Sequence, residues 1–134
     1  MQSTAMKYLV IFILLFTTRL HAQETREVTM TAADTARYEV QRFEGRLARL
    51  REGLEKNDIS PVVGAYTNLL GDIREEIART ETRAPESPRL PSMQFILTKF
   101  DEFIFDPTKP DELKPHLERF DEFLGLMKAE RGMK

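Results

Sequence analysis

The residues of this chain that could do chemistry are few, and they do not form a complete reactive set. The 134 residues include no cysteine, and the two histidines are His21 and His116. A di-iron site in a helical bundle needs inward carboxylates and Glu-x-x-His pairs, and no such pair occurs in the sequence. Glu112 and His116 stand four residues apart and share a helical face, which supplies two metal ligands at most. We therefore expect no metal centre, and retain Glu112 and His116 only as candidates for a weak surface zinc contact.

Nucleophilic catalysis would have to use His116, because His21 lies in an N-terminal segment that we expect to be removed. The remaining serines, Ser60, Ser87 and Ser92, stand at expected helix starts or in a linker, where capping accounts for them. Acidic pairs on the expected helices face outward, whereas acid–base catalysis needs a carboxyl group in a cleft. The sequence predicts a protein that is not an enzyme, with a hydrolase using His116 as the alternative.

Residues 1–22 have the pattern of a secretory signal peptide. Lys7 precedes an apolar run of nine residues, 8–16, which polar residues then end. Nine helical residues rise about 13 Å, well short of a hydrocarbon core about 30 Å thick. We predict cleavage after Ala22, export to the periplasm or the extracellular space, and no stable membrane span afterwards. An uncleaved N-terminal anchor is the alternative.

Composition narrows the partners of the mature chain. The hydrophobic fraction is 41% and the charged fraction 31%, a globular balance. Removing residues 1–22 removes Lys7 and Arg19 but no acid, which changes the formal net charge from -2 to -4. A weakly negative chain gives no reason to expect nucleic acid or an anionic membrane surface as partner. Without cysteine, packing alone must stabilise the exported domain.

Apolar side chains recur at spacings of three and four in four segments, which predicts four helices. Ser60 is expected to cap the second helix, with Pro61 at its first position. Pro115 is expected in the first turn of the fourth, where its missing N–H costs little. The expected helices are residues 31–57, 60–80, 92–105 and 114 onward. The expected buried seams are Ala36, Val40, Phe43, Leu47, Leu50 and Leu54; Val62, Tyr66, Leu69, Ile73 and Ile77; Met93, Leu97, Phe100 and Ile104; and Leu113, Leu117, Phe120, Leu124 and Met127.

The connections between these helices predict an all-α, up-down-up-down four-helix bundle over residues 31–134, preceded by a flexible lead-in at 23–30. Two connections are short, and residues 81–91, with three prolines and no apolar period, form a longer linker. The mature chain is expected to be a monomer or a homodimer.

Lys99–Ile104 recurs as Arg119–Leu124, twenty residues later, with the same order of cationic, aromatic and acidic residues. One interpretation is a duplicated hairpin with a paired binding surface. The other, which we favour, is that two amphipathic helices meet the same demand for buried aromatic and exposed acidic side chains.

Polar and small residues beside the seams allow two interpretations each. Gly64 and Gly71 share a stripe of the second helix, which indicates a close approach of another helix or a ligand, or simply tolerated glycines. Arg42, Arg46 and Arg49 form a ridge beside the first seam. This ridge is either a ligand surface or, as we favour, a set of solvated residues and cross-helix ion pairs.

Phenylalanines are the clearest surface signal. Six of the nine lie between residues 95 and 123. Phe95 and Phe105 fall off the seams, so if exposed they would anchor an unknown protein partner or a small hydrophobic ligand. If the core is wide, both are structural, and that is the interpretation we favour. The expected function is an exported, non-catalytic binding or structural module.

The layout resembles the cytochrome b562 family of exported four-helix bundles, including the connection Arg83-Ala84-Pro85-Glu86-Ser87-Pro88 between helices two and three. The resemblance implies haem held by a methionine near the start of helix one and a histidine near the end of helix four. Met30 is the counterpart of the methionine, but Lys128–Met133 contains no histidine, and His116 lies about three turns earlier. There is also no Cys-x-x-Cys-His for covalent haem. We therefore expect no cofactor, with haem as the option that the resemblance leaves open.

Overall fold

The computed structural model describes residues 31–133 and divides the chain into two compact units, Met1–Thr35 and Ala36–Lys134. Of the first unit, it describes Thr31–Thr35, at the start of helix α2 (Ala32–Glu55). There the Thr31 hydroxyl accepts a hydrogen bond from the Asp34 amide at 3.1 Å, as an N-cap does. The expected signal peptide, the lead-in and Met30 lie outside the described residues.

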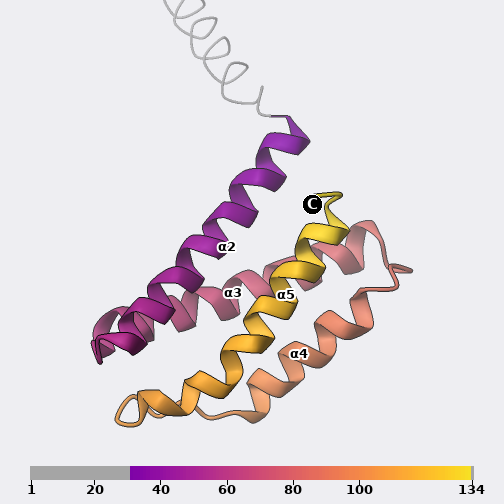
Figure 1. Ribbon diagram of the computed structural model, residues 1–134. Coiled ribbons are helices and arrows are strands. Elements are labelled where there is room, and N and C mark those ends of the chain that lie inside the picture. Colours follow the sequence, from indigo (N-terminus) through magenta and orange to yellow (C-terminus); the bar gives the residue numbers. More distant parts are fainter. Residues whose placement is uncertain (1–30, 134) are drawn as a thin grey trace, which may run out of the picture. The chain divides into compact units, whose positions relative to one another are not determined.

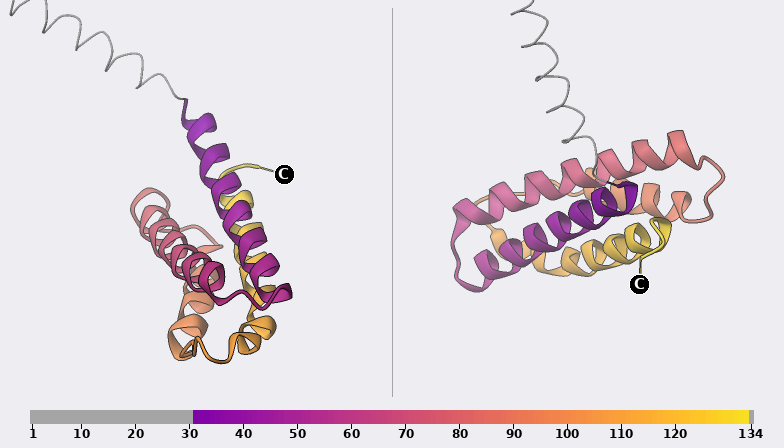
Figure 2. Two further views of the ribbon diagram at one scale, coloured as in Figure 1. Left: turned by 90° about the vertical axis from the view of Figure 1, so that its left-hand side faces the viewer. Right: turned by 90° about the horizontal axis from the view of Figure 1, so that it is seen from above.

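The second unit is an all-α four-helix bundle (Figure 1). It contains α2 from Ala36, α3 (Ile59–Arg83), α4 (Leu90–Glu102), the 3-10 helix η1 (Pro110–His116) and α5 (Leu117–Glu130), and residues 31–133 contain no strand. Neighbouring helices run antiparallel in the order α2, α3, α4 and α5, and α5 lies beside α2, which closes the bundle (Figure 2). Two contacts between each pair of neighbours show this order. Glu39–Arg79 and Arg42–Asp72 join α2 to α3, and Arg74–Asp101 and Glu81–Gln94 join α3 to α4. Arg89–Glu130 and Phe100–Phe120 link α4, including the residue before it, to α5, and Glu44–Lys128 and Arg51–Asp121 join α5 to α2.

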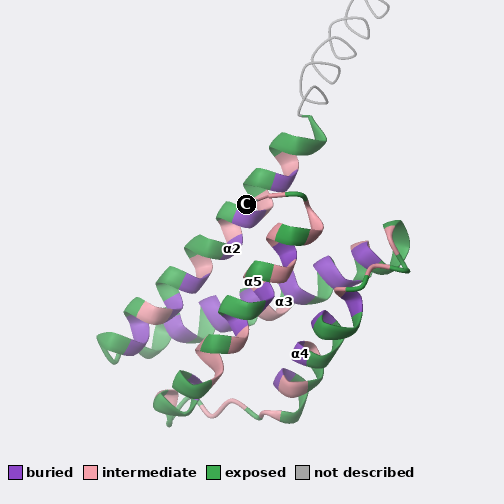
Figure 3. Ribbon diagram, turned by 45° about the vertical axis from the view of Figure 1, so that its right-hand side comes forward, coloured by how far each residue is buried: buried purple, intermediate pink, exposed green. Residues whose placement is uncertain are grey.

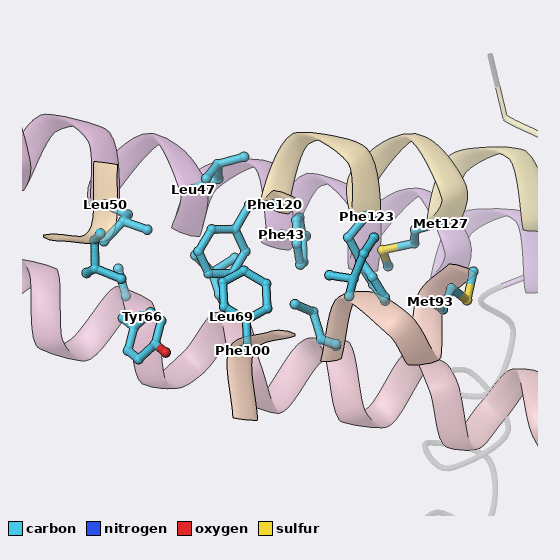
Figure 4. Close-up of a cluster of buried hydrophobic side chains, with 14 of the residues drawn as sticks. Phe43, Leu47, Leu50, Tyr66, Leu69, Met93, Phe100, Phe120, Phe123 and Met127 are labelled. Atoms are coloured by element: carbon cyan, nitrogen blue, oxygen red, sulfur yellow. The ribbon is translucent and has the colours of Figure 1, made fainter. Parts of the chain in front are cut away.

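Aromatic rings fill the middle of the bundle (Figure 4). Phe100 and Phe120, the matching phenylalanines of the internal repeat, stack on each other with ring centroids 4.4 Å apart. Tyr66 packs edge-to-face against both rings. The ring centroids of Phe43 on α2 and Phe123 on α5 are 5.8 Å apart. Buried residues line the inward side of each helix (Figure 3). Each fully buried large side chain contributes about 1.5–3 kcal/mol, so this cluster is the main source of stability.

The turn between α2 and α3 depends on two residues. Asn57 has φ 53°, and the amides of Asn57 and Asp58 donate to the carbonyls of Leu54 and Gly53, which is a Schellman motif. A Cβ on Gly53 would lie 2.7 Å from Cγ2 of Val62, so glycine is required for this approach. Of the two interpretations of Gly64 and Gly71, the structure supports the favoured one, tolerated glycines, and not a close approach, because both face open space. The Ser60 cap is also wrong, because the preceding turn already starts α3 at Ile59.

The seams of the last two helices differ from the sequence prediction by about one position. Ile96 and Phe123 are buried, whereas Leu97 and Leu124 are only half-buried. Ile96 and Leu97 are adjacent apolar residues, as are Phe123 and Leu124, so spacing alone does not decide which of the two faces the core. Ile104, expected in the third seam, is 86% exposed because α4 has already ended at Glu102.

The connections are also shorter or differently built than expected. α3 continues to Arg83 and α4 begins at Leu90, so the linker between them is only six residues long. The fourth helix does not start near Lys114. Pro110 and Pro115 both lie within the 3-10 helix η1, and the α-helix begins at Leu117. Proline lacks the N–H that an α-helical turn would need, which accounts for the delay.

Candidate functional site

The most constrained polar group of the bundle is a cluster around Arg131, the residue that follows α5. Its side chain is 3% exposed. Arg131 Nη2 donates to Glu39 of α2 at 3.0 Å and to Glu76 of α3, and its Nε donates to Glu76 at 3.2 Å. Arg79 also reaches Glu39, at 3.4 Å. We call Glu39, Glu76, Arg79 and Arg131 the Arg131 cluster; it joins three helices through charge-assisted hydrogen bonds.

A second ionic group lies beside it, about one helical turn along α3. The Asp72 carboxylate is 6% exposed and accepts from Arg46 at 2.5 Å and from Arg42 at 3.2 Å. Arg42 also lies 3.7 Å from the exposed Glu75. Arg42 and Arg46 therefore make cross-helix ion pairs, the interpretation favoured from the sequence, whereas Arg49 is exposed.

Three buried polar atoms of these two groups have no hydrogen-bond partner within residues 31–133. They are Nη1 of Arg131, Nε of Arg42 and Oδ2 of Asp72. Removing one member of such a buried network leaves an opposite charge without compensation, which costs far more than an exposed pair contributes.

Within the Arg131 cluster, Glu39 and Arg131 favour each other's ionised form. Burial raises the pKa of Glu39, but the hydrogen bond and charge of Arg131, together with Arg79 and Arg42, outweigh it and lower that pKa below its ordinary value. Burial lowers the pKa of Arg131, but its hydrogen bonds to Glu76 and Glu39 have the larger combined effect, so the pKa lies above its ordinary value. Burial, followed by the charges of Arg131 and Arg83, lowers the pKa of Arg79.

The sequence contained one signal of these ionic groups. Asp72, Glu76 and Thr80 recur every four residues beside the apolar seam of α3, and all three are buried. A polar stripe of this kind faces either solvent or a neighbouring helix, and only the packing of α2 decides between the two. Arg131 lies beyond the apolar pattern of α5 and had no such signal.

His116 lies at the junction of η1 and α5, half-buried against aromatic rings of α4. Its ring centroid is 4.1 Å from that of Phe103 and 6.0 Å from that of Phe100. Arg119 Nη1 lies 2.5 Å from His116 Nδ1, which requires that nitrogen to be the acceptor. Burial, and then the charge of Arg119, lower the pKa of His116. Its neighbours thus favour a neutral ring in a structural position.

The other candidates for metal binding or catalysis lie apart from His116. Glu112 is exposed on η1, and no three His, Cys, Asp or Glu residues within 31–133 are placed to share a metal ion. The Ser87 hydroxyl donates to Glu130 at 2.5 Å in the connection between α3 and α4, at the opposite end of the bundle. Arg89 joins the same carboxylate at 3.3 Å, so Ser87 ties this connection to α5.

Phe95 and Phe105 have different surroundings. Phe95 is 61% exposed on α4, with Lys99 Nζ 5.2 Å from its ring centroid. Phe105 is half-buried, and its ring centroid lies 5.0 Å from that of Tyr66. Phe105 is therefore part of the packing around Tyr66, while Phe95 on α4 and Ile104 in the segment after α4 are large apolar side chains exposed to solvent.

A groove of about 410 Å³ lies between the end of α2 and η1, lined by Arg51, Leu54, Glu55, Asp111 and Lys114 among others. Its size falls within the range of small-molecule sites. Its cations are already paired, however, Arg51 with Asp121 and Lys114 with Asp111 at 3.1 Å. The groove thus has no spare positive charge to attract an anionic ligand.

No family model, curated protein or solved structure matches this chain. No helix within residues 31–133 combines the length and the apolar character needed to cross a bilayer. The functional proposal therefore depends on the residues themselves.

Proposed function

We propose that the mature chain is an exported, non-catalytic helical module that binds a protein partner or a small hydrophobic ligand through the exposed apolar side chains of α4 and of the segment that follows it. The observation that carries the proposal is the exposure of Phe95 and Ile104, 61% and 86%, beside a well-packed core. Large apolar side chains held in water cost free energy, and removing them from water on binding recovers it. The cation of Lys99 over the Phe95 ring adds a polar contact at the edge of this surface.

The non-catalytic part of the proposal is supported by the positions of the reactive residues. His116 contacts phenylalanines and Arg119, while Ser87 is bound to Glu130 at the other end of the bundle. The buried carboxylates Asp72 and Glu76 bind arginines that join helices. A hydrolase using His116 remains the alternative, and a measured hydrolytic activity that His116→Ala abolishes would establish it.

The binding surface is tested with Phe95→Ser and a matched control, Tyr38→Ser. Tyr38 is 55% exposed on α2, so both variants remove an exposed aromatic ring without touching the core. We expect Phe95→Ser to weaken the fluorescence of an apolar dye, and any self-association seen by sedimentation velocity, more than Tyr38→Ser does. Equal behaviour of the two variants and the native chain would refute the surface on α4 and leave a purely structural module.

Export is tested by the mass of the protein isolated from its native cells. Cleavage after Ala22 predicts a chain that begins at Gln23 and is found outside the cytoplasm. A chain that retains residues 1–22, or that is recovered from the cytoplasm, would contradict the proposal.

A haem carrier of the cytochrome b562 type is the second candidate, favoured by the antiparallel four-helix architecture. The residues near the end of α5 do not fit it well, because Lys128–Met133 lacks a histidine and the buried side chain there is Arg131, bound to Glu39 and Glu76. A Soret absorbance band in protein purified from its native compartment would establish haem binding, and its absence after incubation with haem would exclude it.

A further inference from the structure

The pair α2 and α3 opens like a V from the turn that joins them (Figure 1). At the turn, Gly53 lets Val62 approach closely. Two to three turns further along α2, Arg42 and Arg46 span the gap to Asp72, and beyond them Glu39 meets Arg79.

Arg131 lies in the open end of this V and bonds to both arms. It binds Glu39 on α2 and Glu76 on α3 from its position after α5. The adjoining stretch of α2, residues 36–43, which we call the α2 strap, buries Ala36, Val40 and Phe43 and is otherwise held by the ionic contacts of Glu39 and Arg42. Local opening starts at the ends of packed units, and within the second unit the strap is the end of α2 that lies farthest from the turn to α3.

We propose that Arg131 is a latch that holds the α2 strap closed over α5, and that releasing it lets the strap swing out while α3, α4 and α5 stay packed. The apolar surface uncovered by this movement is the one that Phe43 covers, including the ring of Phe123. The remaining core does not depend on the strap, because Phe100, Phe120 and Tyr66 pack among α3, α4 and α5. The bundle thus contains a built-in route to expose an aromatic face without unfolding.

The test is amide hydrogen exchange of the folded mature chain, compared among the native protein, Arg131→Met and Arg74→Met. Arg74 pairs with Asp101 between α3 and α4, both about half exposed, so its variant also removes one interhelical arginine but leaves α2 untouched. For Arg131→Met we expect amides in the α2 strap to exchange faster by about tenfold or more, while those around Phe100 and Phe120 keep their protection. For Arg74→Met we expect changes below about twofold in the strap.

The latch is overturned if Arg131→Met accelerates exchange equally in all four helices, which indicates one cooperative unit, or if the strap is unaffected. Should Arg131→Met fail to fold, Glu39→Gln provides the same test, because it removes the charge from the tie to α2 and leaves the pair between Arg131 and Glu76. Uniform acceleration, or no acceleration, in Glu39→Gln overturns the latch equally.

Discussion

Truncating Phe120 should destabilise the protein far more than truncating Phe95, although both change phenylalanine to alanine on neighbouring helices. Phe120 is completely buried, stacked on Phe100 and in edge contact with Tyr66. Phe95 is 61% exposed and contacts the Lys99 side chain. The pair therefore separates the stability that the aromatic core provides from the surface role proposed for α4.

The magnitudes follow from burial. Removing a buried phenylalanine ring typically costs 3–5 kcal/mol, roughly, because burial is lost and a cavity remains. A domain of this size is stable by about 5–15 kcal/mol, so Phe120→Ala should lose at least about a fifth of that. Phe95→Ala removes only an exposed cation–π contact worth about 0.5–1 kcal/mol.

Urea denaturation followed by far-ultraviolet circular dichroism measures both values. With a slope of about 1–3 kcal/mol per molar urea, Phe120→Ala should lower the midpoint by at least about 1 M, and Phe95→Ala by well under that. Equal losses in the two variants, or a larger loss for Phe95→Ala, would refute the assignment of Phe120 to the core and of Phe95 to the surface. A native chain with little helical signal would refute the bundle itself.

Two further predictions concern the turn and the single histidine within residues 31–133. Gly53→Ala should destabilise the protein, because the clash of its Cβ with buried Val62, 2.7 Å away, outweighs the gain of about 1 kcal/mol in helix propensity. Gly45→Ala should stabilise it, because the space around Gly45 is open. Thermal melts measure both changes, and a Gly53→Ala variant as stable as the native chain would contradict the close approach. The pKa of His116 in the folded chain lies below the ordinary value of 6.5. Above pH 6.5 the ring is neutral in both states and does not change the free energy of unfolding with pH. As the pH falls below 6.5, the unfolded chain binds a proton more readily than the folded chain does, which lowers that free energy. The stability of the native chain should therefore fall just below pH 6.5, whereas that of His116→Gln should remain level until the carboxyl groups titrate at lower pH. An NMR titration that gives His116 a pKa at or above 6.5 would contradict this prediction.

The helices could be predicted from the sequence because apolar periodicity is a local property of each segment. All six predicted seam residues of α2 and all five of α3 are buried. The helix ends were less accurate, since capping and proline geometry compete within a few residues, as at Ser60 and Pro115. The shift from Leu97 to Ile96 and from Leu124 to Phe123 arose because each pair is two adjacent apolar residues, and spacing does not decide which of them faces the core.

The sequence by itself determined the all-α class, the number of helices and the apolar faces, because these depend on side chains three or four positions apart. Only the tertiary structure decided where the charges go, because a polar stripe such as Asp72 and Glu76 is the same in sequence whether it faces water or another helix. Arg131 reaches partners 55 and 92 residues away, and no local pattern encodes such a contact. The proposed latch is therefore a property of the packed bundle, whereas the helices it joins are properties of the chain.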